Sequence, residues 1–372
     1  MIYLIVFFSS FLFIKMGNRI EKNKKRVLAL ILYGIGLLIP AILAGIRDYT
    51  IGTDVMVYGN AWFDRAVDSS NLRDYIHWGV ISQVGVGYLL LNYLVAIVSD
   101  NPHVFYFVLA LVINILIFKG VHSCKEYINI DFAMLIFFLL FYNNTLNLLR
   151  QSLAIAIIMS GFGYVINKKL FKYIIVVVFA GMTHSTAFLG ILIYFIYNIQ
   201  FSKYRSLVKT GIICALLGCI VLYQGIVSFL VSKGIILSRY SSYSDVQTGG
   251  GKMVRICLFC LPAILLFYFV YKKVKKDIWY NFGFMILLFS TFLSVLLFVN
   301  SIASRIAMYF DIYYIVLIPV FAKRVNLSTG KNRVLVKNYS QIFLGFFYVF
   351  YWWMVYVYQG QAATYPFLLF TK

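Results

Sequence analysis

The sequence predicts an all-α, polytopic integral membrane protein of about 12 to 13 transmembrane helices. Of its 372 residues, 62% are hydrophobic and only 12% are charged, and the mean hydropathy is +0.88. A water-soluble globule cannot cover that much apolar surface, whereas a bundle of membrane helices presents it to lipid. The 33 basic residues, against 12 acidic ones, fall mostly in short clusters between apolar runs. This is the pattern of positive-inside topology, and we expect no nucleic-acid partner.

The elements that we expect are successive apolar runs. A helix needs about 20 apolar residues to cross a bilayer, and each run near that length counts as one candidate crossing. We interpret the first run as a retained span, because no basic residue precedes it and no small-residue cleavage site follows. The runs lie near 2–14, 27–46, 79–98, 104–120, 131–146, 148–166, 171–182, 184–199, 207–230, 253–271, 278–299, 304–322 and 340–358.

Charge orients these runs in the membrane. The basic cluster from Lys15 to Arg26 places the first loop in the cytoplasm, and later basic clusters agree with it. We therefore expect a single transmembrane domain over residues 1–372, with periplasmic loops at about 47–78 and 232–252. The mixed charges and aromatics of 47–78 suit short helices at the membrane interface. The topology of 79–166 stays open, because Lys119 and Lys125 favour one arrangement and the polar run 143–147 favours the other.

Chemically rich residues gather in one stretch, Gly45 to Tyr58. Directly after an apolar run, it brings together Arg47, Asp48, Asp54 and Tyr58 in a chain with little other charge. Either carboxylate could accept a proton from a sugar hydroxyl. For Asp54 the alternative is a structural turn cap after Gly52 and Thr53. The spacing alone does not decide between the two.

Ionisable groups within spans are the other candidates, because they cost several kcal/mol unless they face a cavity or a partner. They are Arg150 with Gln151, His184, Arg305 with Tyr309 one helical turn later, and Asp311. The arginines could also snorkel to an interface, and His184 could serve as a hydrogen-bonded helix terminus. Since a guanidinium pairs two hydrogen bonds with phosphate oxygens, converging arginines at a membrane surface favour a lipid-linked phosphate or diphosphate. His184 could act as a base near neutral pH.

Cofactor chemistry has little support in the sequence. Cys257 and Cys260 are spaced as C-x-x-C, but they have no second pair and no nearby histidines, so we interpret them as apolar fillers of a helix. No Walker-type nucleotide loop is present in the sequence. We expect neither a metal nor a cofactor.

The ordered motifs resemble those of a known family. The stretch from Arg47 to Tyr58 is similar to the R-x-x-x-x-G-T-D-x-x-x-Y signature of EpsG-like and Wzy-type polysaccharide polymerases. The resemblance spans roughly positions 40 to 310. One departure is that family members often carry a glutamate before the Gly-Tyr pair, where this chain has Gly85 and Val86, with Gln83 the nearest polar group. The further matching stretches are Gly87–Asn92, Asn147–Ala154, Thr183–Ala187 and Ser304–Phe310.

This resemblance implies a GT-C-like membrane glycosyltransferase of the bacterial inner membrane. Such an enzyme polymerises oligosaccharide repeat units on undecaprenyl diphosphate at the periplasmic face, as O-antigen polymerases do in lipopolysaccharide biosynthesis. It also implies partnership with a chain-length regulator and a flippase. The alternatives are a flippase or exporter of the lipid-linked oligosaccharide, an O-antigen ligase and a membrane acyltransferase.

The residues can be given roles in such a transfer. Arg47, Arg150 and Arg305 would neutralise the departing diphosphate, and Gln151, Tyr58 and Tyr309 are further candidates for binding the diphosphate or glycan. Asp54 or His184 would deprotonate the acceptor hydroxyl, with Asp48 orienting it. Which of the two is the base stays open.

Overall fold

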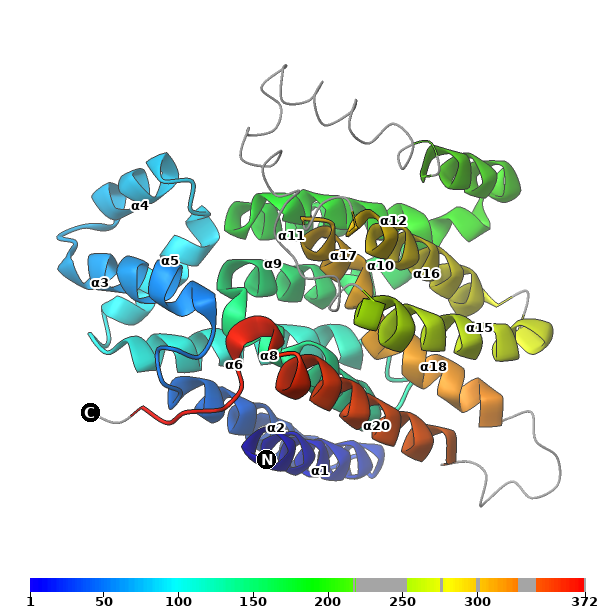
Figure 1. The fold of residues 1–372 in the computed structure, drawn as a ribbon, viewed down its shortest axis with the longest axis horizontal. Helices are drawn as coiled ribbons and strands as arrows, with labels where there is room; N and C mark the ends of the chain where they lie inside the picture. Colours follow the sequence, from blue (N-terminus) through cyan, green and yellow to red (C-terminus); the bar gives the residue numbers. More distant parts are fainter. Residues whose placement is uncertain (217, 219–252, 275–276, 299–301, 327–338, 371–372) are drawn as a thin grey trace. The chain divides into compact units, whose positions relative to one another are not determined.

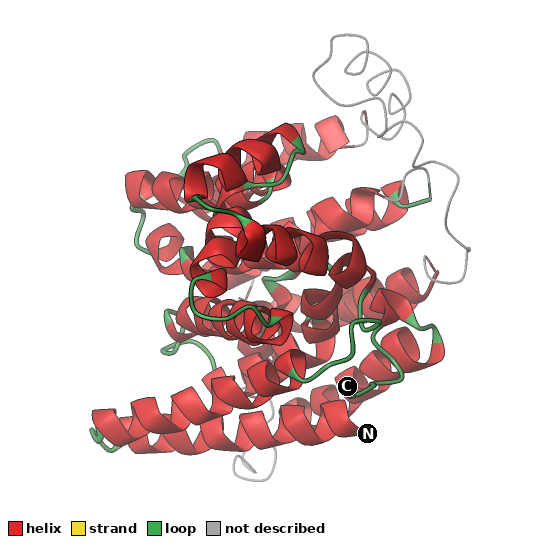
Figure 2. Cartoon of the chain, turned by 90° about the vertical axis from the view of Figure 1, so that its left-hand side faces the viewer, coloured by secondary structure: helices red, strands yellow, loops and turns green. Residues whose placement is uncertain are grey.

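The computed structural model describes residues 1–216, 218, 253–274, 277–298, 302–326 and 339–370 (Figure 1). Over these residues the regular elements are helices, joined by loops and turns, with no strand and one isolated β-bridge (Figure 2). The expected all-α class is therefore confirmed. The expected periplasmic loop at about 232–252 lies outside the described residues.

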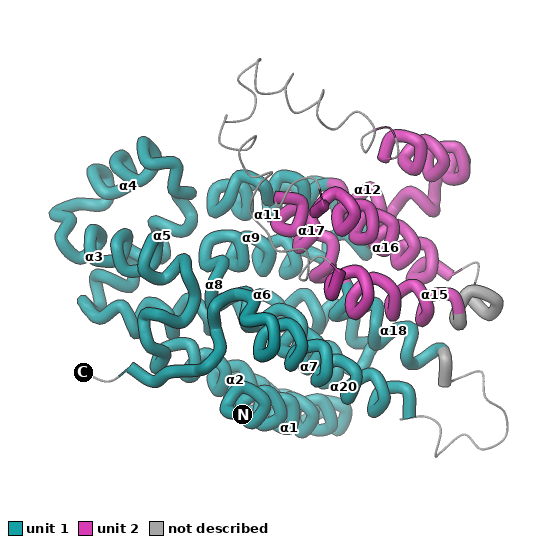
Figure 3. Tube along the Cα trace, in the orientation of Figure 1, with its two compact units in different colours: residues 1–191, 314–372 teal, residues 192–313 magenta. Residues whose placement is uncertain are grey.

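The described helices group into two compact units, residues 1–191 with 314–372 and residues 192–313 (Figure 3). In unit 1 the elements are α1 Ile2–Lys22, α2 Arg26–Gly45, the π-helix η1 Val55–Asn60, α3 Ala61–Asp68, α4 Leu72–Ile81, α5 Val86–Ala96, α6 Pro102–His122, α7 Ile130–Leu140, α8 Tyr142–Asn147, α9 Leu149–Ser160, α10 Phe162–Ile166, α11 Leu170–Thr183, the 3₁₀ helix η2 Ser185–Gly190, α18 Tyr314–Asn326, α20 Tyr339–Trp352, the π-helix η7 Trp353–Tyr358 and the 3₁₀ helix η8 Gln361–Ala363. Unit 2 holds most of α12 Ile191–Asn198, then η3 Ile199–Phe201, η6 Arg255–Cys260, α15 Leu261–Val274, α16 Ile278–Leu296 and α17 Ile302–Asp311.

Six stretches among the described residues are long and apolar enough to cross a membrane, or seven if α17 and α18 count as one broken span. The six are α1, α2, α6, Leu149–Ile166, α16 and Tyr339–Tyr358, and five shorter apolar helices of 10–17 residues accompany them. This confirms a polytopic membrane protein. We expected 12 to 13 transmembrane helices from the sequence because every apolar run was counted as one crossing. The run at 131–146, for example, is broken at Phe141 into α7 and α8.

Helix α7 is the centre of unit 1. It contacts α1, α6, α8, α18 and α20, and every residue from Phe132 to Leu140 is buried. Because its neighbours surround it, α7 is apolar on all faces, as a buried helix must be. It ends where α8 begins, and α8 carries the polar segment 142–147 toward the stretch that follows α2.

The loop at 47–78 folds into short helices, as predicted. The elements η1, α3 and α4 follow one another, and the Tyr75 hydroxyl donates a hydrogen bond of 2.9 Å to the Trp62 carbonyl. This bond ties α4 back onto α3. Their placement at the membrane interface stays a prediction.

Helices α1 and α2 form an antiparallel pair that depends on small residues. A β-carbon at Gly36 would lie 2.8 Å from the Ile14 side chain and 3.2 Å from the Ser10 carbonyl. The Ser10 hydroxyl also donates a 2.5 Å hydrogen bond to the Gly36 carbonyl. Close packing of small residues is a principal means by which helices associate in lipid, so Gly36 fixes this pair.

We predict that Gly36→Leu destabilises the protein by about 1–3 kcal/mol through overpacking. Gly34 is the matched control, because it lies in the same helix and a β-carbon there meets nothing within 4 Å. Thermal unfolding in detergent should show a lower Tm for Gly36→Leu and an unchanged or higher Tm for Gly34→Leu. Equal losses in both variants would contradict the packing argument.

Candidate active site

The stretch after α2 begins with a buried arginine. Arg47 is 1% exposed, and its Nη1 donates a 2.8 Å hydrogen bond to the carbonyl of Leu146 in α8. Its guanidinium carbon lies 4.6 Å from the centre of the Tyr106 ring, a cation–π contact. Arg47 thus joins α2, α6 and α8 at one end of unit 1.

The chain's C-terminal segment lies along the same stretch. The amide of Asp48 donates to the Leu368 carbonyl at 2.9 Å, and the amide of Gly52 donates to the Ala363 carbonyl at 2.8 Å. An isolated antiparallel bridge pairs Arg47 with Leu369. The backbone of residues 46–52, which is not helical, therefore finds hydrogen-bond partners within the protein.

Gly52 brings this stretch against the 146–147 backbone. Its φ is +90°, and a β-carbon there would lie 2.4 Å from the Leu146 carbonyl oxygen. Next to it, the Asn147 side-chain oxygen accepts hydrogen bonds from the Thr53 hydroxyl at 2.8 Å and from the Asp54 amide at 3.3 Å. The Gly-Thr-Asp motif is therefore docked on the segment that leads into α9.

Arg150, in the first turn of α9, reaches the same motif. Its guanidinium carbon lies 4.0 Å from the centre of the Tyr58 ring, and its side chain is partly exposed. The structure thus brings together two residues, Arg150 and Tyr58, that the sequence predicts as diphosphate or glycan ligands. A guanidinium stacked on an aromatic face keeps its N–H edge directed away from the ring, where it can donate to an anion.

The Gly-Tyr and Thr-His motifs also meet. At the start of α5, a β-carbon on Gly85 would lie 2.1 Å from the Thr183 carbonyl, and one on Gly87 would lie 2.4 Å from the Thr183 hydroxyl. The ring centre of the next residue, Tyr88, lies 5.7 Å from that of Phe105 in α6. The Gly-Tyr motif therefore packs against the Thr-His motif at the N-terminus of α5 in unit 1.

The three candidates for proton transfer differ in their surroundings. The Asp48 carboxylate accepts hydrogen bonds from the Thr50 hydroxyl at 2.7 Å and the Thr50 amide at 3.0 Å, and these bonds hold the pKa of Asp48 below its usual range. A lower pKa makes Asp48 a weaker base. Asp54 is partly exposed beside Asn147, and the Nδ1 of His184 lies 2.8 Å from the Thr186 hydroxyl at the end of α11.

The remaining predicted residues are placed as follows. Gln151 is 3% exposed in α9, directly after Arg150. Arg305 and Tyr309 lie on α17 in unit 2, where Arg305 is exposed and Tyr309 is fully buried. Their proposed part in substrate binding stays a prediction. No group of three or more His, Cys, Asp or Glu able to hold a metal ion occurs within the described ranges.

Unit 2 contains a buried ion pair that the sequence did not reveal. Arg255 donates through Nη2 to a carboxylate oxygen of Asp311 at 2.5 Å and through Nε to the Ser294 hydroxyl at 2.8 Å. The Ser290 hydroxyl donates to the other Asp311 oxygen at 2.6 Å. Asp311 is recognisable in the sequence as an ionisable group within a span. Its partner, Arg255, lies at the start of a different apolar run, so no sequence spacing links the two. The only indication in the sequence of such a partner is that an acidic residue inside the membrane requires a cation near it.

Two further features of the site escaped prediction. Tyr106, which supports Arg47, lies in an apolar helix with no polar motif around it. The segment 361–370 pairs with residues more than 300 positions away in the sequence, and no local pattern reports such a contact.

Comparison with known proteins gives one match. No curated protein and no solved structure matches the chain. The EpsG family matches residues 30–369, which run from α2 through the C-terminal segment and include all the motifs that meet in unit 1. On this match over nearly its whole length, the chain belongs to the EpsG family.

Proposed function

We propose that this protein is a membrane glycosyltransferase that polymerises undecaprenyl-diphosphate-linked oligosaccharide units into a surface polysaccharide, such as O-antigen. Membership of the EpsG family supports a membrane polysaccharide polymerase. The observation that carries the proposal is the placement of Arg150 on the Tyr58 ring, three residues after the Asn147 that holds Thr53 and Asp54. An anion-binding group and a carboxylate then lie in one small region.

The proposed reaction transfers a glycan from its lipid carrier to a new unit. The acceptor's hydroxyl oxygen attacks the anomeric carbon of the growing chain, and the bond from that carbon to the diphosphate oxygen breaks. The diphosphate lipid leaves with the bonding electrons, and a base takes the proton from the hydroxyl. Arg150 would stabilise the charge that develops on the departing diphosphate.

The surroundings of each residue suggest a division of roles. Arg47 is buried and bonded to the Leu146 carbonyl, so we assign it to positioning the 146–150 segment and to raising the positive potential there. Asp48 holds the Thr50 turn and would orient the loop. Asp54 or His184 would act as the base, and Gln151, Arg305 and Tyr309 would bind glycan or diphosphate.

The proposed orientation follows from charge. The basic segment from Lys22, the last residue of α1, to Arg26, the first residue of α2, lies at the opposite end of α2 from Arg47. If that basic loop is cytoplasmic, the candidate site faces the periplasm of a bacterial inner membrane. A flippase that delivers the lipid-linked units and a chain-length regulator are the partners that such a reaction would need.

We predict that Arg150→Ala abolishes long glycan chains. Cells deleted for the gene would be complemented with the intact gene or a variant, and the surface-glycan ladder would be compared on a gel at matched protein abundance. Removing one group that stabilises transition-state charge costs about 10²–10³-fold in rate, so the ladder should collapse to single units. Arg65→Ala is the control, since Arg65 makes a similar contact with Trp62, at 4.7 Å, outside the motifs.

The deletion itself tests the reaction class. Single repeat units that persist on the core in the deleted strain support polymerisation. Loss of even the single unit would place the defect in export or ligation and would contradict the proposal. Long chains made by Arg150→Ala at normal abundance would remove Arg150 from the site.

We predict that Gly52→Ala also abolishes long chains, because a methyl group there would displace the Leu146 carbonyl that Arg47 binds. Gly360→Ala is the matched control, since Gly360 also has a positive φ, +64°, but a β-carbon there meets nothing within 4 Å. Both variants carry the backbone strain, and only Gly52→Ala adds the clash. Equal glycan ladders from the two variants would show that the contact with Leu146 is unimportant.

The base is tested by Asp54→Ala, His184→Ala and the double variant. We predict that one of the single variants shortens the ladder as strongly as the double variant does, because loss of a general base costs about 10²–10⁴-fold. That residue is then the base. A double variant that still makes long chains at normal abundance would contradict both assignments.

A further inference from the structure

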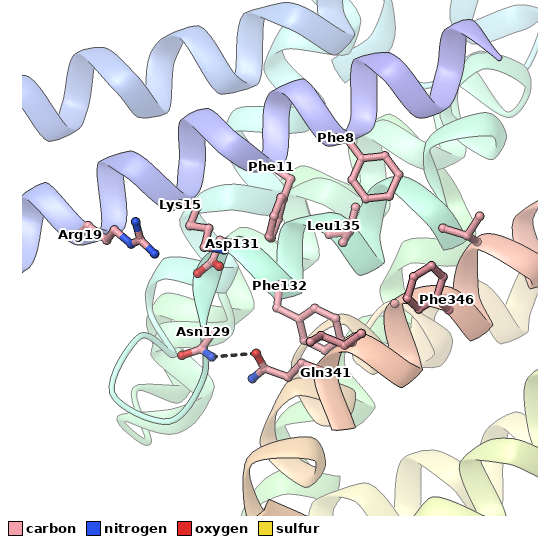
Figure 4. A pocket seen from close by; sticks show the side chains of 13 residues that line it. Phe8, Phe11, Lys15, Arg19, Asn129, Asp131, Phe132, Leu135, Gln341 and Phe346 are labelled. Carbon is pink, nitrogen blue, oxygen red and sulfur yellow. Dashed lines mark hydrogen bonds between the residues drawn. The ribbon is translucent and has the colours of Figure 1, made fainter. Parts of the chain in front are cut away.

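A groove in unit 1 lies away from the candidate active site. It has a volume of about 610 Å³ and runs between α1, α7 and α20 (Figure 4). Tyr3, at the start of α1, donates a hydrogen bond to the Thr364 carbonyl in the C-terminal segment that pairs with residues 46–52, whereas the groove reaches Arg19 near the other end of the helix. None of the residues that line the groove has a role in the proposed transfer reaction.

The groove is polar at one end and apolar along the rest. Figure 4 shows Lys15, Arg19, Asp131 and the bonded amides Asn129 and Gln341 grouped together, 3.2 Å separating the two amides' bonded atoms. Rings and aliphatic side chains continue the groove from there toward Phe8, Leu135 and Phe346. Such a division matches a molecule with a charged head and an apolar tail.

The groove opens onto surface that must face lipid. Helix α1 and the stretch Tyr339–Tyr358 are both candidate spans, and in each only 28% of the apolar window is buried in the protein. Phe8 is 42% exposed and Phe346 is 74% exposed on the two sides of the groove. Apolar surface of this extent on a membrane helix is solvated by acyl chains.

The charges at the polar end are not balanced within the groove. Lys15 and Arg19 line it with one carboxylate, Asp131, whose Oδ1 accepts a 3.1 Å hydrogen bond from Asn18. Lys15 lies seven residues before the end of α1, which is about 10 Å along the helix axis. A cation at that depth on a lipid-facing helix is costly without an anionic partner. One more negative charge would neutralise the cluster.

We propose that this groove binds an anionic phospholipid with two acyl chains. The phosphate lies between Lys15 and Arg19 and accepts charge-assisted hydrogen bonds from them, and the acyl chains lie along Phe11, Leu135 and Phe346. The Asn129 and Gln341 amides face the glycerol and headgroup oxygens. The site is independent of the proposed polymerase activity, and it fixes the outer helices α1 and α20 through a shared lipid.

Native mass spectrometry of the full-length protein in detergent tests this proposal. The probes are palmitoyl-oleoyl phosphatidylglycerol, which is anionic, and the zwitterionic phosphatidylcholine with the same chains. We expect phosphatidylglycerol to bind the intact protein at least tenfold more tightly. Lys15→Gln with Arg19→Gln should remove that preference, whereas Lys22→Gln with Lys25→Gln, outside the groove, should keep it.

A second variant tests the apolar part of the groove. Gly345 lines it, and a β-carbon there meets nothing within 4 Å, so Gly345→Leu fills the groove without a clash and favours the helix. We expect this variant to fold with unchanged Tm and to lose phosphatidylglycerol binding at least tenfold, although all its charges remain.

Three results would overturn the proposal. The first is equal binding of the two lipids. The second is an equal loss of phosphatidylglycerol preference in the Lys15→Gln, Arg19→Gln variant and in the Lys22→Gln, Lys25→Gln control. The third is full phosphatidylglycerol binding by Gly345→Leu. The second would indicate a diffuse surface-charge effect, and the third would place the lipid outside the groove. None of these results bears on the glycan ladder, so this proposal and the proposed function fail separately.

Discussion

The buried charge of Arg47 is the constraint on which the candidate site depends. Burying an ion costs several kcal/mol unless other groups replace its water. Within the described part of the chain no carboxylate forms an ion pair with it, and its compensation comes from the Leu146 carbonyl and the face of the Tyr106 ring. The dipoles that surround Arg47 stabilise its charge without cancelling it. A positive potential therefore remains, and an anionic substrate would be attracted to it.

This arrangement also explains why the local backbone is irregular. A helix satisfies its own peptide groups, but residues 46–52 do not form one, so partners must come from elsewhere in the protein. The C-terminal segment supplies them through Ala363 and Leu368, and the Thr364 hydroxyl holds that segment in place by accepting a 2.8 Å hydrogen bond from Asn143. The same short helix, α8, thus anchors the C-terminal segment through Asn143 and accepts from Arg47 through Leu146.

The sequence predicts the fold class better than the contacts within the candidate site. Apolar runs reveal helices because lipid demands them, yet the run near 131–146 did not show the break at Phe141, because the change from the apolar α7 to the polar segment 142–147 does not by itself indicate that a helix is interrupted. The expected gathering of Arg47, Arg150 and Arg305 stays a prediction: the first two are linked to Leu146 and Tyr58 within unit 1, and Arg305 belongs to unit 2. Arg47 is buried and Arg150 is partly exposed because distant residues such as Tyr106 pack around them differently, and no local sequence pattern encodes that packing.

Four glycines in or beside the candidate motifs lie at close contacts between segments of unit 1. Gly52 has a positive φ, but Gly59, Gly85 and Gly87 do not, so conformational freedom cannot be their shared role. In all four, a β-carbon would lie 2.1–2.4 Å from a neighbouring atom of unit 1. The atoms concerned belong to Leu146, Tyr106 and Thr183, which adjoin or support the candidate residues. These glycines therefore let the segments of the candidate site approach one another, and at Gly52 a larger side chain would displace the Leu146 carbonyl that compensates the charge of Arg47.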